Sequence, residues 1–352
     1  MRKLKFIALF VIAATIVFAQ KQPKNIVFII GDGMGLAHIY AGMVANGNKL
    51  QLERFKNIGF SKTYSANNFT TDSGAGGTAL ACGVKTKNGM IGMDADSVVA
   101  ESILKVAEKN GLSTGMVTTC DITHATPASF IAHQVSRKMT EEIAADFLKT
   151  DIDVFIGGGR KNFEKRDDNR NITNELKAKG YSIAYTLDEA KKVKEGKLAG
   201  LLYDVHNPPM PDRGDMLPEA TIAALDILDN NKKGFFMMIE GSQIDWAAHD
   251  NNADQIIKEV LDLDKTIGKV LDFAEKNKNT LVIVTADHET GGLTLPKGNL
   301  ANKESKASFS TKDHSGVPVP VFAFGPGAEN FTGFMENISF KNKLIKLLKL
   351  KN

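Results

Sequence analysis

The chain has little cysteine, with two residues in 352, so it cannot be a small scaffold held together by disulfide bonds. It also lacks an excess of charge of one sign, because 44 Lys and Arg stand against 41 Asp and Glu. No basic stripe is interleaved with aromatic residues, which argues against a nucleic-acid-binding protein. Proline is scarce, with 10 residues, and no low-complexity linker or internal repeat occurs. What remains is the composition of a globular protein that can bury a large core.

The first 19 residues differ from the rest of the chain. They begin with basic residues, contain no acidic residue, and continue as an apolar run from Phe6 to Phe18. This run is shorter than the ~20 residues that span a bilayer. Val17 and Ala19 occupy the small-residue positions of a cleavage site. We therefore predict a signal peptide over residues 1–19, a mature chain from Gln20, and export to the periplasm or medium; an uncleaved membrane anchor is the alternative.

The two cysteines, Cys82 and Cys120, lie in apolar, small-residue surroundings. Export would place them in an oxidising compartment, where a disulfide can form. The surroundings favour two buried thiols over a bridge.

Short apolar segments alternate with helical patterns along the chain. Strands are expected over residues 25–30, 115–119, 153–156, 235–239, 281–285 and 319–324. Helices are expected over residues 37–45, 73–81, 98–109, 141–148, 220–228, 255–275 and 337–348. This alternation predicts an α/β fold with a mainly parallel central sheet, flanked by helices on both faces. Residues 160–215 are charged and weakly periodic, so we expect a peripheral insertion within a single domain, residues 20–352.

Polar residues that can bind metal follow four of these strands and precede the last one. In open α/β sheets, ligands bind beyond the carboxyl ends of the strands. Candidate ligands there are Asp32, His124, Thr126, Glu240, Asp245, His249, Asp287, His288, Glu289 and His314. Imidazole and carboxylate suit Zn²⁺, whereas carboxylate and hydroxyl oxygens suit Mg²⁺. Because so many carboxylates repel one another without cations, the pattern predicts bound metal.

Ser73 stands at the start of an expected helix, within a run of small residues. One interpretation is that Asp72 or Ser73 only caps the helix. The other is that Ser73 is a nucleophile, activated by a metal ion and by the helix N-terminus. The small residues behind it would let the backbone approach a phosphate group.

Six motifs occur in order between about residues 24 and 330: GDGMG, TDSGAGGTA, HATPASFIAH with a following arginine, EGSQIDWAAH, TADHETGG and DHSGVPVPVFAFG. Taken alone, GDGMG could begin a dinucleotide-binding fingerprint, but its spacing and its aspartate disfavour that interpretation. Together the motifs resemble those of the alkaline phosphatases, a family of metal-dependent phosphomonoesterases. The resemblance implies that phosphate monoesters are hydrolysed to alcohol and inorganic phosphate through a covalent phosphoserine.

The resemblance also implies a role for each matched residue. Ser73 is the nucleophile and Arg137 the phosphate clamp. The first zinc ion is held by Asp245, His249 and His314, the second by Asp32, Asp287 and His288, and a magnesium ion by Asp32, Thr126 and Glu240. His124 stands where some members have aspartate, and we expect it either to meet the magnesium through water or to lie behind the magnesium ligands. Trp246 stands where some members have lysine or histidine, so it supplies no positive charge.

Further expectations follow from the resemblance and from what lies outside the motifs. The substrates are expected to be small phosphomonoesters, without a nucleic-acid partner or a stable membrane anchor, and a homodimer is left open. Only 25 residues separate His288 from His314, too few for the added surface domain of larger members. His38 and His206 fall outside every motif and are expected to be ordinary surface or helix residues. A phosphodiesterase or sulfatase of the same superfamily, and a non-catalytic protein that binds metal or phosphate, are the alternatives.

Overall fold

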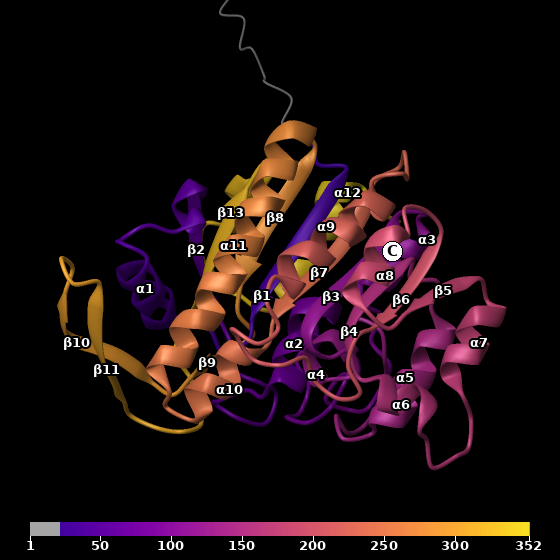
Figure 1. Ribbon diagram of the computed structural model, residues 1–352, viewed down its shortest axis with the longest axis horizontal. Helices are drawn as coiled ribbons and strands as arrows, with labels where there is room; N and C mark the ends of the chain where they lie inside the picture. The colour runs from indigo at the N-terminus through magenta and orange to yellow at the C-terminus, as the bar shows by residue number, and fades with distance from the viewer. Residues whose placement is uncertain (1–21, 352) are drawn as a thin grey trace, which may run out of the picture.

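The computed structural model describes residues 22–351, and the expected signal peptide lies outside the described residues. Figure 1 shows a central sheet with helices packed across it. Ten strands form this sheet in the order β14-β2-β13-β8-β1-β7-β3-β4-β6-β5. Only β13 runs antiparallel to its neighbours, β2 and β8. The predicted α/β fold with a mainly parallel sheet is confirmed.

The strands of the main sheet are β1 (Asn25–Gly31), β2 (Asn57–Lys62), β3 (Ser113–Asp121), β4 (Val154–Gly158), β5 (Tyr181–Ala184), β6 (Lys197–Leu201), β7 (Phe235–Gly241), β8 (Thr280–Thr285), β13 (Val319–Phe324) and β14 (Gly333–Glu336). Two smaller antiparallel pairs are β9 (Glu289–Thr290) with β12 (His314–Ser315), and β10 (Leu293–Asn299) with β11 (Glu304–Phe309).

The α-helices are α1 (Leu36–Ala45), α2 (Ser73–Cys82), α3 (Ile103–Lys109), α4 (Ala125–Ala128), α5 (Thr140–Asp146), α6 (Arg160–Glu164), α7 (Ile172–Ala178), α8 (Leu187–Lys192), α9 (Met216–Leu228), α10 (Gln243–His249), α11 (Ala253–Asn277) and α12 (Ser339–Leu348). Three short 3₁₀ helices cover Gln51–Arg54, Phe147–Lys149 and Ala328–Phe331. Within residues 22–351, no helix has the length and hydropathy needed to cross a membrane.

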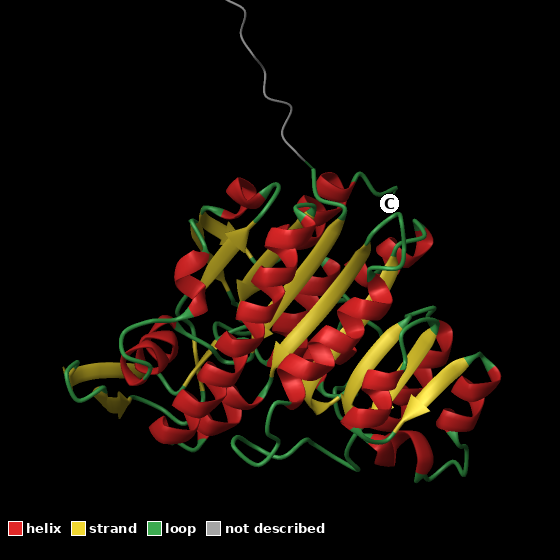
Figure 2. Cartoon of the chain, turned by 45° about the horizontal axis from the view of Figure 1, so that its top comes forward, coloured by secondary structure: helices red, strands yellow, loops and turns green. Residues whose placement is uncertain are grey.

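Both faces of the sheet are covered, as the apolar strands predict. Successive side chains of a strand point to opposite faces. Val27 and Ile29 of β1 therefore join the core beneath α9 and α11, while Phe28 joins the core on the other face, with α3 and α12. Figure 2 shows helices on both sides of the strands.

Two segments differ from the expectations. The helix expected from residue 98 begins only at Ile103, because the Ser102 hydroxyl accepts a hydrogen bond from the Lys105 amide (3.1 Å) and so caps it. Residues 160–215 contain α6, α7, α8 and two strands, β5 and β6, which extend the main sheet at one edge. Helices and strands this short contain too few residues to show a clear hydrophobic periodicity in the sequence.

Candidate active site

The candidate ligands lie at one edge of the sheet, beyond the carboxyl ends of neighbouring strands. The four strands β8, β1, β7 and β3 are adjacent in the sheet. Asp287 follows β8, Asp32 follows β1, Glu240 lies near the end of β7, and Thr126 lies just beyond β3, in α4. The parallel arrangement of these strands therefore brings together side chains that are as much as 255 residues apart in the sequence.

Asp245, His249 and His314 form the first cluster, in which one donor atom of each residue lies within 4.8 Å of the others. Asp245 and His249 share a face of α10, whereas His314 arrives on β12, which pairs with β9. Nε2 of His249 lies 3.4 Å from Asp245 Oδ2 and 3.2 Å from Nε2 of His314.

Backbone carbonyls orient both imidazole rings of this cluster. His249 Nδ1 contacts Lys312 O at 2.5 Å, and His314 Nδ1 contacts Thr71 O at 2.7 Å. A carbonyl only accepts, so each Nδ1 donates and each neutral ring keeps its lone pair on Nε2. Two lone pairs 3.2 Å apart repel unless a cation lies between them. Without metal, a proton on His249 removes this repulsion, since the hydrogen bond to Asp245 raises the pKa of His249 to about 9.

Asp32, Asp287 and His288 form the second cluster, and all three are at most 1% exposed. His288 Nε2 lies 3.2 Å from Asp287 Oδ2 and 3.4 Å from Asp32 Oδ1. Burial and the neighbouring carboxylates raise the pKa of Asp287 to about 8 and that of Asp32 well above its usual range. Burial, followed by the charge of His314, lowers the pKa of His288 far below its usual value. The cluster therefore places a neutral imidazole against carboxyl groups that ionise with difficulty unless a cation joins them.

Thr290 connects the two clusters. Its hydroxyl donates to Asp245 Oδ1 at 2.5 Å and lies 3.2 Å from His288 Nδ1. Because the hydroxyl proton goes to Asp245, the Thr290 oxygen accepts from His288 Nδ1, which leaves the Nε2 lone pair of His288 inside the cluster. Sequence analysis missed this residue, although it lies two positions after His288 in the TADHETGG motif.

Ser73 begins α2, and its Oγ lies 3.2 Å from His288 Nε2. Every residue of α2 is buried. A side chain at Gly76 would lie 3.1 Å from Asp287, and one at Gly77 would lie 2.9 Å from the Ser129 hydroxyl. Glycine is therefore required for this helix to lie close to the second cluster and to present Ser73 to it.

Asp72 caps α2, as one interpretation of the sequence predicts, and also contacts Arg137, the expected phosphate clamp. Its Oδ1 accepts from the Ala75 amide (2.9 Å), which caps α2. Its Oδ2 accepts from Arg137 Nη1 (3.0 Å), while Arg137 Nη2 lies 3.3 Å from His124 Nε2. The helix cap thus also fixes the guanidinium of Arg137 beside the cluster.

Glu240, Thr126 and Asp32 form a third group of oxygen donors. Thr126 Oγ1 lies 3.4 Å from Asp32 Oδ2, and Glu240 Oε2 accepts from Thr118 Oγ1 at 2.5 Å. Cys120 and His124 also lie beside Glu240. Among the described residues, Cys82 and Cys120 are unbridged and buried, which confirms the predicted thiols.

Several buried oxygen atoms of these clusters have no hydrogen-bond partner within residues 22–351. They are Asp32 Oδ1, Asp287 Oδ2 and Glu240 Oε1. An unpaired buried acceptor is unfavourable, and carboxylate oxygens bind divalent cations. The residues present therefore fit a metal centre on their own geometry.

Trp246 and two histidines form a cluster of rings next to Arg137. The Trp246 ring centroid lies 5.8 Å from that of His124 and 4.6 Å from that of His206. His206 is exposed, as expected, but Arg137, His124 and His206 all line a small hollow of about 270 Å³. His38 is a helix residue, as expected, although it is fully buried and accepts from the Gly35 amide.

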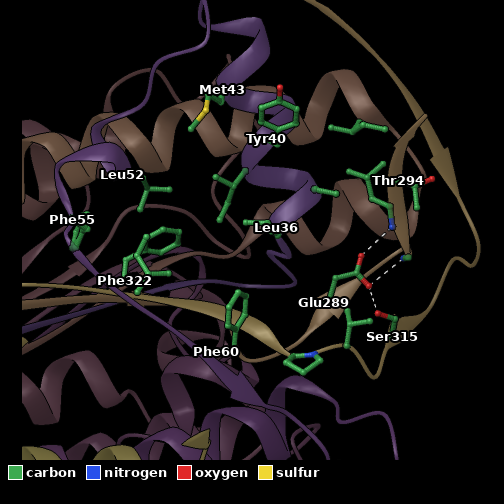
Figure 3. A pocket seen from close by; sticks show the side chains of 18 of the residues that line it. Leu36, Tyr40, Met43, Leu52, Phe55, Phe60, Glu289, Thr294, Ser315 and Phe322 are labelled. Carbon is green, nitrogen blue, oxygen red and sulfur yellow. Dashed lines mark hydrogen bonds between the residues drawn. The ribbon is translucent and has the colours of Figure 1, made fainter. Parts of the chain in front are cut away.

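A second hollow, of about 1120 Å³, lies elsewhere and is mainly apolar. Figure 3 shows Leu36, Tyr40 and Phe60 lining it, with Glu289 at one side. Glu289 accepts hydrogen bonds from the amides of Gly292 and Leu293 and from the Ser315 hydroxyl. This hollow offers no cluster of donors for a phosphoryl group, so the polar edge of the sheet is the candidate active site.

Comparison with known proteins agrees with this geometry. The family model described as alkaline phosphatase matches residues 23–301. Alkaline phosphatase 4 of Bacillus subtilis is 36% identical, over 94% of this chain and 91% of its own length. The chain belongs to the alkaline phosphatase family. Alkaline phosphatase of Escherichia coli is 30% identical over 90% of this chain and 84% of its own length.

Solved structures of alkaline phosphatases share the fold. The alkaline phosphatase from the Antarctic bacterium TAB5 has a TM-score of 0.90 and 42% identity, over 95% of this chain and all of that chain. A variant of it with one histidine changed to aspartate has magnesium bound in a site named M3. The enzyme of Thermus thermophilus has a TM-score of 0.85 at 25% identity. The predicted family and enzymatic activity are confirmed: the chain is a metal-dependent phosphoric monoester hydrolase.

Proposed function

We propose that the chain hydrolyses small phosphate monoesters by transferring the phosphoryl group to Ser73 and then to water. One observation carries this proposal: the Nε2 atoms of His249 and His314 face one another, and Nε2 of His288 lies 3.2 Å both from Asp287 Oδ2 and from the Ser73 hydroxyl. Such a set of donors fits divalent cations and leaves a hydroxyl at their side.

The donor types suggest the identity of the cations. Asp245, His249 and His314 would hold one zinc ion, and Asp32, Asp287 and His288 a second, since imidazole with carboxylate suits zinc. The oxygen donors of Asp32, Thr126 and Glu240 would hold magnesium. When bound, these cations supply Lewis-acid catalysis, which lowers the pKa of oxygen ligands and stabilises negative charge on phosphoryl oxygens.

Different residues of the chain then react with the substrate and bind it. The Ser73 oxygen attacks phosphorus, and the alcohol leaves as the covalent phosphoserine forms. Water then releases inorganic phosphate and restores the Ser73 hydroxyl. The Arg137 guanidinium presents two donors to the non-bridging oxygens, held in place by Asp72. Positioning and electrostatic stabilisation supply most of the rate acceleration in such a transfer.

The test compares the hydrolysis of nitrophenyl phosphate, its diester and nitrophenyl sulfate, followed by acid quenching and mass spectrometry. We expect the monoester to react fastest and the phosphate to be found on the peptide that contains Ser73. Faster hydrolysis of the diester or the sulfate, or a phosphorylated peptide without Ser73, would contradict the proposal. Binding of zinc and phosphate without turnover would favour the non-catalytic alternative.

We also propose that residues 1–19 are removed on export to the periplasm or medium, and that residues 20–352 form one catalytic domain with residues 160–215 at its periphery. The basic start and short apolar run support the first part. The mass of the chain recovered from outside the cytoplasm tests it. We expect a mature chain that begins at Gln20, whereas an intact N-terminus in the membrane fraction would indicate an anchor.

A further inference from the structure

A cysteine lies beside the third group of oxygen donors, and the family resemblance gives it no role. Cys120 is near the end of β3, His124 caps α4, and Glu240 is near the end of β7. One donor atom of each residue lies within 4.8 Å of the other two. Cys120 and Glu240 are fully buried, and Cys120 Sγ lies 3.5 Å from Glu240 Oε2.

Two polar atoms of this group have no partner among the residues that the structure describes. They are Glu240 Oε1 and His124 Nδ1, and both are buried. In the absence of metal, Arg137 donates to Nε2 of His124, so the ring proton lies on Nδ1 and finds no acceptor. A buried acceptor and a buried ring nitrogen that both lack partners, next to a thiol, form the donor set of a metal site.

We propose that Cys120, His124 and Glu240 bind a borderline divalent cation, Zn²⁺ or Co²⁺, which takes Glu240 from the magnesium position and so excludes magnesium. Thiolate, imidazole and carboxylate together suit zinc, whereas magnesium prefers oxygen donors alone. The thiol proton is released to solvent as the metal–sulfur bond forms. This inference rests on the proposed function only for the position of magnesium.

The site is coupled to the phosphate clamp through His124. A cation on Nδ1 moves the ring proton to Nε2, where it opposes the Arg137 guanidinium, now 3.3 Å away. The contact that holds Arg137 on this side is thereby lost. Zinc at this site should therefore slow the enzyme by two routes, by excluding magnesium and by loosening Arg137.

The experiment uses the full mature enzyme, freed of metal and titrated with Co²⁺. Neither zinc cluster contains a cysteine, so a thiolate-to-cobalt charge-transfer band in the near ultraviolet reports Cys120 alone. We expect this band in the native enzyme, its loss in Cys120→Ser, and its decrease when magnesium is added. Cys82→Ser is the matched control, because Cys82 is the other buried thiol and contacts Ser129 O instead; it should keep the band.

Absence of the band in the native enzyme, which needs no variant to fold, would overturn the inference, and so would its persistence in Cys120→Ser. A second measurement titrates zinc beyond two ions per chain. We expect the affinity for the third zinc to fall by at least about tenfold in Cys120→Ser, as for lost metal-site contacts; equal affinity would also overturn it. If only this inference fails, the enzyme still binds two zinc ions and hydrolyses the monoester. If the proposed function fails, the binding of two zinc ions and the hydrolysis of the monoester are lost as well.

Discussion

Two groups of buried carboxylates in this protein differ in how their charge is balanced. Glu259 and Asp262 of α11 face Arg213, whose Nη2 lies 2.7 Å from Asp262 Oδ2 and also contacts Glu259. Glu259 accepts further bonds from the Met210 amide (2.9 Å) and from Gln255 Nε2 (2.8 Å). In this cluster the chain supplies the cation itself.

The candidate active site buries its carboxylates without such a partner. Asp32 and Asp287 are at least as buried as Glu259, yet each keeps an oxygen that no described residue satisfies. The guanidinium whose charge acts on Asp32, that of Arg137, is already paired with Asp72. Burial of acidic residues is thus common to a structural and a functional site. What distinguishes the site that needs metal is that no cationic side chain balances its carboxylates.

Removal of metal is expected to have the largest effect and to separate the two groups. Chelation should abolish hydrolysis and lower the melting temperature. An ion that binds only the native state, at a free concentration of 100 times its Kd, adds about 2.7 kcal/mol per site to the free energy of unfolding. The Arg213 cluster needs no metal and should be unaffected. Assay and thermal unfolding before and after dialysis with EDTA, then with zinc and magnesium restored, measure this. An unchanged rate and melting curve would contradict the metal assignment.

Ser73→Ala should lower kcat by several orders of magnitude, because the acceptor of the phosphoryl group is lost while the metal ligands remain. The fold should survive, since alanine fits the first turn of α2. Ser61→Ala is the control, because Ser61 is equally buried on β2 and its hydroxyl has no partner within residues 22–351. Turnover close to that of the control would remove Ser73 from the mechanism.

Arg213→Met should affect the other cluster in the opposite way. Leaving Glu259 and Asp262 buried and unpaired is expected to cost about 3–5 kcal/mol of unfolding free energy. The kcat of the folded fraction should stay unchanged, because within residues 22–351 the Arg213 guanidinium bonds to Pro208 O, Glu259 and Asp262, none of which is a candidate site residue. Arg54→Met, which breaks partly exposed pairs with Asp272 and Glu275, should cost about 1 kcal/mol or less. Denaturant unfolding compares the two variants, and equal losses would mean that Arg213 does not balance a buried charge.

Arg137→Ala is expected to have the smallest effect of the four. Loss of two charge-assisted hydrogen bonds to phosphate should weaken inhibition by inorganic phosphate by about 10- to 100-fold, or about 1.4–2.8 kcal/mol. Arg160→Ala, which removes an arginine paired with Asp204, is the control. Product inhibition measured on both variants tests the clamp. Unchanged inhibition in Arg137→Ala would show that the metal ions alone hold the phosphate.

The sequence predicted the sheet and the residues at its edge because strands and motifs are local patterns. The apolar segment of β1 and the Asp that follows it can be read without any knowledge of the fold. The orientation of the rings cannot, because His314 Nδ1 is fixed by Thr71 O, 243 residues away. For Cys120 the sequence predicts only a buried thiol, because the pairing of β3 with β7 is what brings it to Glu240.

The most direct test is X-ray diffraction near the zinc absorption edge from crystals of the zinc-loaded protein. The account predicts two strong anomalous peaks, one among Asp245, His249 and His314 and one among Asp32, Asp287 and His288, with Ser73 Oγ beside the second. Zinc bound elsewhere, or Ser73 turned away from both peaks, would contradict it.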